Sequence, residues 1–203
     1  MLRLDHVIFA TGDLDAEADR WRRDLGLASV EGGRHARWGT ANRIVPLGQD
    51  YIELATVVDE DEARTNAFGR ALLERTGSWL GPVVATDDLD DVAGRLGLAI
   101  GEGSRTRPDG ETLRWRSAGF DDPRREWWMP FFIAWDVEAE PHPGRMPATH
   151  ERDVRGIVSV EIAGDAERLA AWTGDGSLPF VVSPGSGEVR TVTIATAAGD
   201  LVI

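Results

Sequence analysis

The sequence repeats one pattern, and this repeat constrains the fold more than any other feature. Residues 10–15 read ATGDLD, and residues 85–90 read ATDDLD. When these two stretches are laid over each other, His6 of the first copy falls on Gly81 of the second. A weaker and shorter third copy follows around Gly164. The spacing is far too long for a solenoid, so the repeat indicates two whole structural units and a partial third.

The first copy predicts a strand, a helix and then three further strands. Residues 3–10 are apolar and β-branched, as in a buried strand. Asp13 then caps a helix with apolar residues at helical spacing, and the strand DYIELATVV (50–58) closes the unit. A βαβββ unit leaves one face of its sheet bare. Two units side by side can curl these faces around a shared cleft, where ligand sites tend to form.

We therefore expect an α+β protein in which repeated βαβββ modules form a curled mixed sheet around a central cleft. The helices should lie outside, with a partial third module at the C-terminus. The expected segments are a first module (1–58), a connector helix (59–77), a second module (78–138), a proline-rich linker (139–153) and the partial third module (154–203). The alternating apolar residues of the last segment must bury one face, so it should fold onto the main domain.

Composition narrows the classes of partner. The net charge of −13 opposes binding to nucleic acid or to an anionic membrane surface. The absence of cysteine excludes disulfides, a thiolate nucleophile and sulfur metal ligands. The N-terminus shows no signal-peptide pattern, and no apolar run approaches the ~18 residues that a membrane helix needs. We expect a cytoplasmic monomer or homodimer whose partner is a small-molecule ligand.

Three stretches resemble the vicinal oxygen chelate superfamily and, within it, the glyoxalase-like domains. They are LDHVIFATGDLDAEADRW (4–21), the block from GGRHARWGTANRIVPLG to YIEL (32–54), and the second copy from GPVVATDDLDD to PFFIAWD (81–136). The resemblance covers most of the two full copies. It implies the modular fold that the repeat already predicts, with its site between the modules.

The resemblance also implies a metal site. In the superfamily's metalloenzymes, a His or Gln on the first strand and a Glu on the fourth strand of each module hold a divalent metal. The metal stabilises a developing oxyanion or activates oxygen or water. His6 and Glu53 match these positions in the first module, but Gly81 and Phe132 stand there in the second. Half a chelate leaves two possibilities open, a divalent metal and no cofactor.

His6 and Glu53 are the candidate catalytic and metal-binding pair. Strand alternation lets both face the cleft if Val7 and Phe9 pack against the helix. A buried carboxylate needs a partner, and a hydrogen bond from His6 would meet that need. Glu53 would then orient the imidazole and raise its basicity. The alternative is a buried His–Glu pair with no chemistry.

Four further residues are candidates for substrate binding: His35, Trp38, Asn42 and Phe132. His35 could supply a third metal ligand or a hydrogen bond to the substrate. Trp38 would give an aromatic wall, and Asn42 a hydrogen-bond donor and acceptor. Each could instead be an ordinary strand or loop residue. The two histidines of the proline-rich linker are expected to have no role.

The sequence leaves several functions open. One is an enzyme of the lyase, isomerase or oxygenase type that acts on a small organic molecule through His6 and Glu53. Glutathione-dependent glyoxalase activity is not expected, because it needs the second module's ligands. Extradiol-type ring cleavage needs iron held by two His and one carboxylate. His6, His35 and Glu53 could supply this set only if the His35 side chain points into the cleft. Another is a non-catalytic protein that binds a drug or metabolite between aromatic walls. A structural or interaction role is the third.

Overall fold

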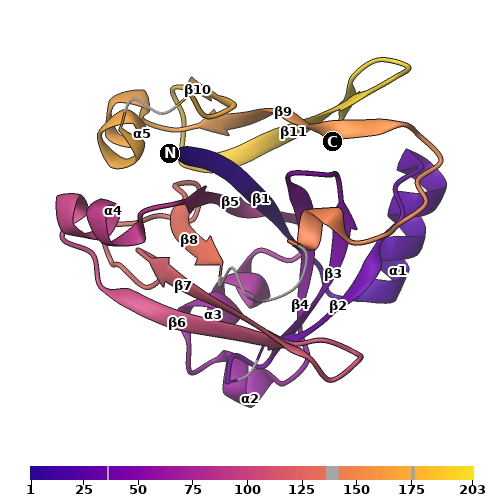
Figure 1. Cartoon of the computed structure of the whole chain (residues 1–203), viewed down its shortest axis with the longest axis horizontal. Coiled ribbons are helices and arrows are strands. Elements are labelled where there is room, and N and C mark those ends of the chain that lie inside the picture. Colours follow the sequence, from indigo (N-terminus) through magenta and orange to yellow (C-terminus); the bar gives the residue numbers. More distant parts are fainter. Residues whose placement is uncertain (36, 136–141, 175–176) are drawn as a thin grey trace.

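The computed structural model describes residues 1–35, 37–135, 142–174 and 177–203. Eight strands form a closed barrel in the order β1-β4-β3-β2-β6-β7-β8-β5 (Figure 1). The barrel strands are β1 (Leu2–Ala10), β2 (Val30–His35), β3 (Thr40–Pro46), β4 (Tyr51–Val57), β5 (Ser78–Thr86), β6 (Ile100–Thr106), β7 (Thr112–Ala118) and β8 (Phe131–Trp135). The expected curled sheet is thus present, and it closes on itself completely.

The barrel sheet is mixed, as expected. β1 is parallel to β4 and β5 is parallel to β8, whereas β1 pairs with β5 and β2 pairs with β6 in antiparallel fashion. The last two pairings join residues 2–57 to residues 78–135 and close the barrel. Because side chains alternate across each strand, one row faces the interior and the other faces the outer layer.

Short helices surround the barrel (Figure 1). They are α1 (Leu14–Arg20), the π-helical turn η1 (Trp21–Leu25), α2 (Glu60–Ala63), α3 (Ala67–Glu74), α4 (Leu89–Leu96), the 3-10 turn η2 (Pro143–Arg145) and α5 (Ala166–Thr173). The expectation that all of them lie outside is wrong for α3, whose Phe68 lines the interior cavity and whose Leu72 shares an apolar cluster with Ile8. The Asp13 carboxylate accepts hydrogen bonds from the amides of Asp15 and Ala16, which confirms the expected helix cap. Asp88 and Asp165 cap α4 and α5 in the same way. Every helix among the described residues is too short or too polar to cross a membrane.

The connector between the barrel halves differs from the prediction of one helix. It consists of α2 and α3, and the break lies at Asn66, whose side chain accepts a hydrogen bond from the Gly69 amide. Asn66 also donates to the carbonyl of Trp38. A Cβ at Gly69 would lie 2.4 Å from the carbonyl oxygen of Ala63, so glycine lets α3 pack on α2. Helical periodicity alone misses such competing side-chain hydrogen bonds.

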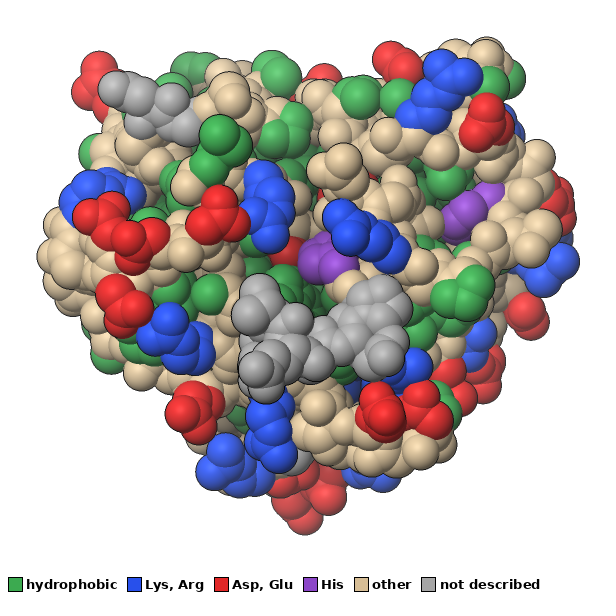
Figure 2. All heavy atoms as spheres, in the orientation of Figure 1, with side chains coloured by type: hydrophobic (Ala, Val, Ile, Leu, Met, Phe, Trp, Pro, Cys, Tyr) green, Lys and Arg blue, Asp and Glu red, His purple; other side chains and the backbone are tan. Residues whose placement is uncertain are grey.

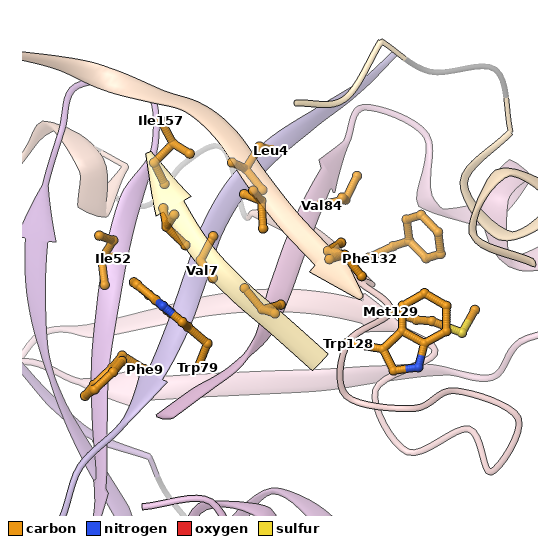
Figure 3. Packing of buried hydrophobic residues seen from close by; sticks show 14 of the residues in the cluster. Leu4, Val7, Phe9, Ile52, Trp79, Val84, Trp128, Met129, Phe132 and Ile157 are labelled. Carbon is orange, nitrogen blue, oxygen red and sulfur yellow. The ribbon is translucent and has the colours of Figure 1, made fainter. Parts of the chain in front are cut away.

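Residues near the C-terminus form a second sheet that packs on the barrel. Its strands are β9 (Val154–Ala163), β10 (Phe180–Ser183), β11 (Glu188–Thr196) and β12 (Leu201–Val202), in the order β10-β9-β11-β12. Ile157 of this sheet shares an apolar cluster with Val7 and Val84 of the barrel (Figure 3). Phe132 of β8 joins the cluster and stacks on Trp172 of α5 at a ring-centroid distance of 6.2 Å. This burial accounts for the alternating apolar residues of the segment.

Two histidines, His142 and His150, anchor the segment that leads from the barrel to this sheet. The imidazole of His150 accepts a hydrogen bond from the Ala28 amide at 3.0 Å, and its other nitrogen donates to the Pro46 carbonyl at 2.7 Å. His142 donates to the Asp5 carboxylate at 2.9 Å. The expectation of no role was therefore wrong, because this segment runs back against the barrel. Residues 139–141, the start of the expected linker, lie outside the described residues.

Close backbone contacts explain why glycine stands at positions 81 and 33. A Cβ at Gly81 in β5 would lie 1.8 Å from the carbonyl oxygen of Trp127, so the second copy has no room for an imidazole in place of His6. Gly33, with φ 131°, lies where β2 meets β6, and a Cβ there would lie 2.0 Å from the Thr106 carbonyl oxygen. Only glycine allows either approach without a shift of the backbone.

Replacing Gly81 with alanine should lower the free energy of unfolding by about 3 kcal/mol, because β5 or the Trp127 backbone must move. The matched control is Gly94→Ala in α4, where a Cβ meets nothing within 4 Å. That exchange should stabilise the protein by up to about 1 kcal/mol through helix propensity. Urea denaturation followed by circular dichroism measures both. A Gly81→Ala variant as stable as the wild type would contradict the packing described for β5.

Candidate functional site

The barrel interior contains a small cavity lined by polar and aromatic side chains. Its volume is about 30 Å³, which is room for about two water molecules. It is lined by His6, Ile8, His35, Trp38, Asn42, Tyr51, Glu53, Phe68, Arg105, Trp115, Phe120, Phe131, Ile133 and Trp135. A hollow of about 460 Å³ shares Trp115 and Trp135 with this cavity. The hollow lies within the size range of small-molecule sites.

His6 and Glu53 lie on neighbouring strands and face the same interior. β1 and β4 run parallel with His6 in register with Tyr51, and both residues line the cavity together with Glu53. Val7 turns outward into the apolar cluster shown in Figure 3. The alternation of side chains thus puts His6 and Glu53 on the interior face of the sheet and Val7 on the outer, apolar face.

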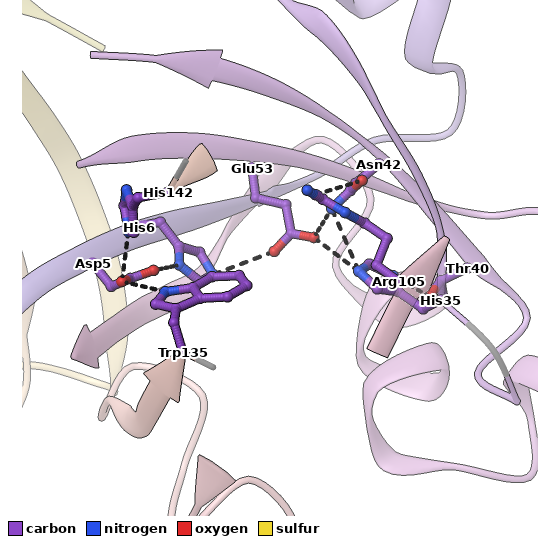
Figure 4. A network of polar contacts seen from close by, with 9 residues as sticks. All are labelled: Asp5, His6, His35, Thr40, Asn42, Glu53, Arg105, Trp135 and His142. Atoms are coloured by element: carbon purple, nitrogen blue, oxygen red, sulfur yellow. Dashed lines mark hydrogen bonds and ion pairs between the residues drawn. The ribbon is translucent and has the colours of Figure 1, made fainter. Parts of the chain in front are cut away.

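The Glu53 carboxylate lies between two imidazoles (Figure 4). Its Oε2 is 3.4 Å from Nε2 of His6, and its Oε1 is 3.5 Å from Nε2 of His35. The amide nitrogen of Asn42 donates a hydrogen bond to Oε1. Glu53 is 5% exposed, so these three groups, rather than bulk water, compensate the buried charge.

Asp5 holds the far side of the His6 ring. The pairing of β1 with β5 shifts register between Leu4 and His6, so Asp5 falls at an irregularity in the strand. Nδ1 of His6 donates to Asp5 Oδ1 at 2.6 Å, and Trp135 and His142 each donate to Asp5 Oδ2 at 2.9 Å. Burial opposes ionisation, but the hydrogen bonds from His142 and His6 outweigh it and hold the pKa of the Asp5 carboxyl far below its usual value. Asp5 is therefore a fixed negative charge.

The surroundings of His6 favour its protonated form. Burial works against the charge, but the carboxylates of Asp5 and Glu53 outweigh burial and raise the His6 pKa above 6.5. The ring also stacks on Tyr51, with centroids 4.4 Å apart and an interplanar angle of 18°. Both nitrogens therefore act as donors, one to each carboxylate.

The pKa values of His35 and Glu53 are both lowered, whereas that of His6 is raised. Burial lowers the His35 pKa to about 4, with Glu53 only partly offsetting it, so the ring is neutral at pH 7. Nδ1 of His35 lies 3.0 Å from the Thr40 hydroxyl oxygen. For Glu53, burial raises the pKa, but His6, His35 and Asn42 together lower it to about 2. One carboxylate thus faces an imidazole whose protonated form is favoured and another that is neutral at pH 7.

Arg105 is a member of the site that sequence reasoning missed. It lies on β6, is 3% exposed, and donates from Nη1 to the Asn42 amide oxygen at 3.2 Å. Asn42 is oriented by charge, with its amino group on Glu53 and its oxygen on Arg105. A Cβ at Gly32 would lie 2.1 Å from that oxygen, so the first glycine of GGRH makes room for the contact. An arginine in a polar, glycine-rich stretch gives no signal of burial.

The other predicted residues fall in different places. His35, Trp38 and Asn42 line the cavity, and His35 points inward. Phe132 does not: its side chain lies in the outer apolar cluster, and its neighbours Phe131 and Ile133 line the cavity instead. The expectation for Phe132 was wrong by one residue, because strand alternation puts it on the opposite face.

The donor set does not fit a divalent metal. Among the described residues, no group of three or more His, Cys, Asp and Glu side chains converges as a metal site would require. His35 and His6 approach different oxygens of Glu53, and Asn42 donates to one of them. A tight site needs three or four protein ligands around one point. We therefore assign no step to a metal.

Comparisons with known proteins agree with the fold. A crystal structure of a hypothetical protein from Staphylococcus aureus is similar over 97% of this chain and 92% of its own, at 18% identity and a TM-score of 0.76. A methylmalonyl-CoA epimerase in complex with methylmalonyl-CoA and NH4+ covers 70% of this chain and 99% of its own, at 20% identity and a TM-score of 0.50. No curated protein matches the sequence.

The sequence itself identifies the family. A model described as the glyoxalase-like domain matches residues 4–175. This match spans both halves of the barrel and continues through α5. It includes every residue of the polar network in Figure 4. The chain belongs to the glyoxalase-like domain family.

Proposed function

We propose that the chain is an enzyme of the isomerase or lyase type that moves a proton on a small organic molecule in the barrel cavity. The observation that carries this proposal is the Glu53 carboxylate, buried between an imidazole that favours protonation and one that is neutral. Environments that push neighbouring pKa values apart are typical of acid–base pairs in active sites.

In this mechanism Glu53 is the base and His6 is the acid. Glu53 takes a proton from a carbon next to a carbonyl group, and the electron pair moves to the carbonyl oxygen. Protonated His6 donates to that oxygen, supported by Asp5 on its other nitrogen. Return of the proton from Glu53 to a different carbon of a conjugated enol completes an isomerisation. Departure of a leaving group with its bonding electrons from the neighbouring carbon completes an elimination instead. In both cases the carbonyl re-forms and its oxygen gives the proton back to His6.

The geometry supports the approach of a substrate between these groups. The nitrogen–oxygen contacts of 3.4 and 3.5 Å are longer than good hydrogen bonds. A substrate that separates Glu53 from His6 removes the main influence holding the Glu53 pKa low, and so makes Glu53 a stronger base. In this proposal the larger part of the substrate occupies the adjoining hollow, beside Trp115 and Trp135.

A non-catalytic binding protein is the second candidate. The observation in its favour is the aromatic lining, in which Trp38 stacks on Phe120 at 5.0 Å with an interplanar angle of 13°. Such walls suit an organic ligand whether or not it reacts. The oxygenase alternative is less well supported, because the iron ligands it needs do not converge among the described residues. Proton exchange into a ligand distinguishes the enzyme from the binder.

Replacing Glu53 with glutamine should abolish proton transfer while the protein stays folded. The test follows loss of C–H signals by proton NMR in D₂O, using a panel of small ketones, aldehydes and 2-oxo acids. We expect a wild-type rate at least about 100-fold above that of Glu53→Gln. Glu60→Gln, on the exposed surface of α2, is the matched control and should keep full activity. Ligand binding without exchange by the wild type would instead support the binding protein.

The two cavity histidines should show opposite protonation states. In ¹⁵N NMR we expect His35 to be neutral at pH 7 and His6 to lose its proton at a higher pH than a free histidine does. The folded His35 pKa lies below its unfolded value, so the stability that neutral His35 contributes is complete above pH 6.5 and is lost as pH falls through about 4. His35→Gln should remove up to about 3 kcal/mol of this pH dependence. A His35 that titrates near 6.5 would contradict the assignment.

A further inference from the structure

The side chain of Arg105 is buried with two of its three nitrogens unpaired among the described residues. Only 3% of the residue is exposed, and its Nη1 donates to Asn42. Nε and Nη2 have no hydrogen-bond partner among the residues that the structure describes. An unpaired buried charge is costly unless it serves a ligand, and the proton-transfer mechanism above does not use this group.

The two free nitrogens form one edge of the guanidinium. Nε–H and the adjacent N–H of Nη2 point in the same direction, which is the fork that matches the two oxygens of a carboxylate. Nη1 lies at the opposite side of the group and is held by Asn42. The arginine is thus anchored at one nitrogen and free along the edge best suited to planar, bidentate recognition.

Arg105 lies in the same cavity as Glu53, the proposed base. Arg105 and Glu53 both line the cavity and are linked through the side chain of Asn42 (Figure 4). Glu53 forms no ion pair with Arg105, since its oxygens face the imidazoles and Asn42. Asn42 therefore lies between the Glu53 carboxylate and the guanidinium of Arg105, which stays available to the anionic group of a ligand.

We propose that Arg105 binds the carboxylate of the substrate, so that the cavity selects small carboxylic acids. The carboxylate accepts two hydrogen bonds from the free edge of Arg105, and the carbon that loses its proton lies toward Glu53. This inference rests on the proposed proton transfer for the role of the carbon, but carboxylate binding itself does not require it. The cavity of about 30 Å³ has room only for the reacting end of such a molecule, and the rest lies toward the hollow beside Trp115 and Trp135.

Thermal denaturation of the full chain with defined probes tests the inference. Propanoate and 2-oxopropanoate should raise the wild-type melting temperature saturably, whereas the uncharged propanamide and inorganic phosphate should not. Arg105→Lys keeps the charge but loses the fork, and we expect at least a tenfold weaker affinity for propanoate. Arg190→Lys, on the exposed side of β11, is the matched control and should bind as the wild type does.

Two further measurements keep the test independent of folding and of catalysis. The Nε–H signal of Arg105 in wild-type protein should shift on adding propanoate, even if the Arg105 variants do not fold. Glu53→Gln should still bind propanoate, so failure of proton transfer leaves the inference standing. Equal binding of propanoate and propanamide, an unshifted Arg105 signal, or undiminished affinity in Arg105→Lys would each overturn it.

Discussion

The burial of the Glu53 carboxylate inside a closed barrel is the constraint on which the rest of the site depends. A charge at that depth is tolerated only if donors surround it. His6, His35 and Asn42 supply them, and each in turn has its own partner: Asp5, Thr40 and Arg105. The network therefore extends across the interior and fixes the orientation of every polar group in it.

The two halves of the barrel contribute differently to this interior. Residues 2–57 supply the carboxylate, both imidazoles and the amide, whereas residues 78–135 supply Arg105 and most of the aromatic wall. The second half cannot repeat the imidazole, because the Trp127 backbone fills the space beside Gly81. The two copies thus share a scaffold but contribute different side chains to the interior. Acidic and basic side chains are interspersed over the face shown in Figure 2.

Much of this could be predicted from the sequence, and the reasons for the failures are physical. Period-two alternation allowed His6 and Glu53 to face one cleft provided that Val7 and Phe9 pack on the other side, since it depends only on local strand geometry. Phe132 was misplaced because matching it to the fourth-strand ligand position of the second copy was one residue out of register. Arg105 was missed because its burial depends on the β2–β6 contact, and no local pattern reports a contact between distant strands.

The protonation state of Glu53 tests the central claim most directly. A ¹³C NMR titration of the side-chain carboxyl, assigned by its absence in Glu53→Gln, measures that state without any substrate. The network described here predicts that the signal of the ionised form persists well below pH 4.5, with a midpoint at about pH 2. A midpoint above 4.5 would mean that burial prevails over the surrounding donors, and would contradict an ionised carboxylate shared between His6 and His35.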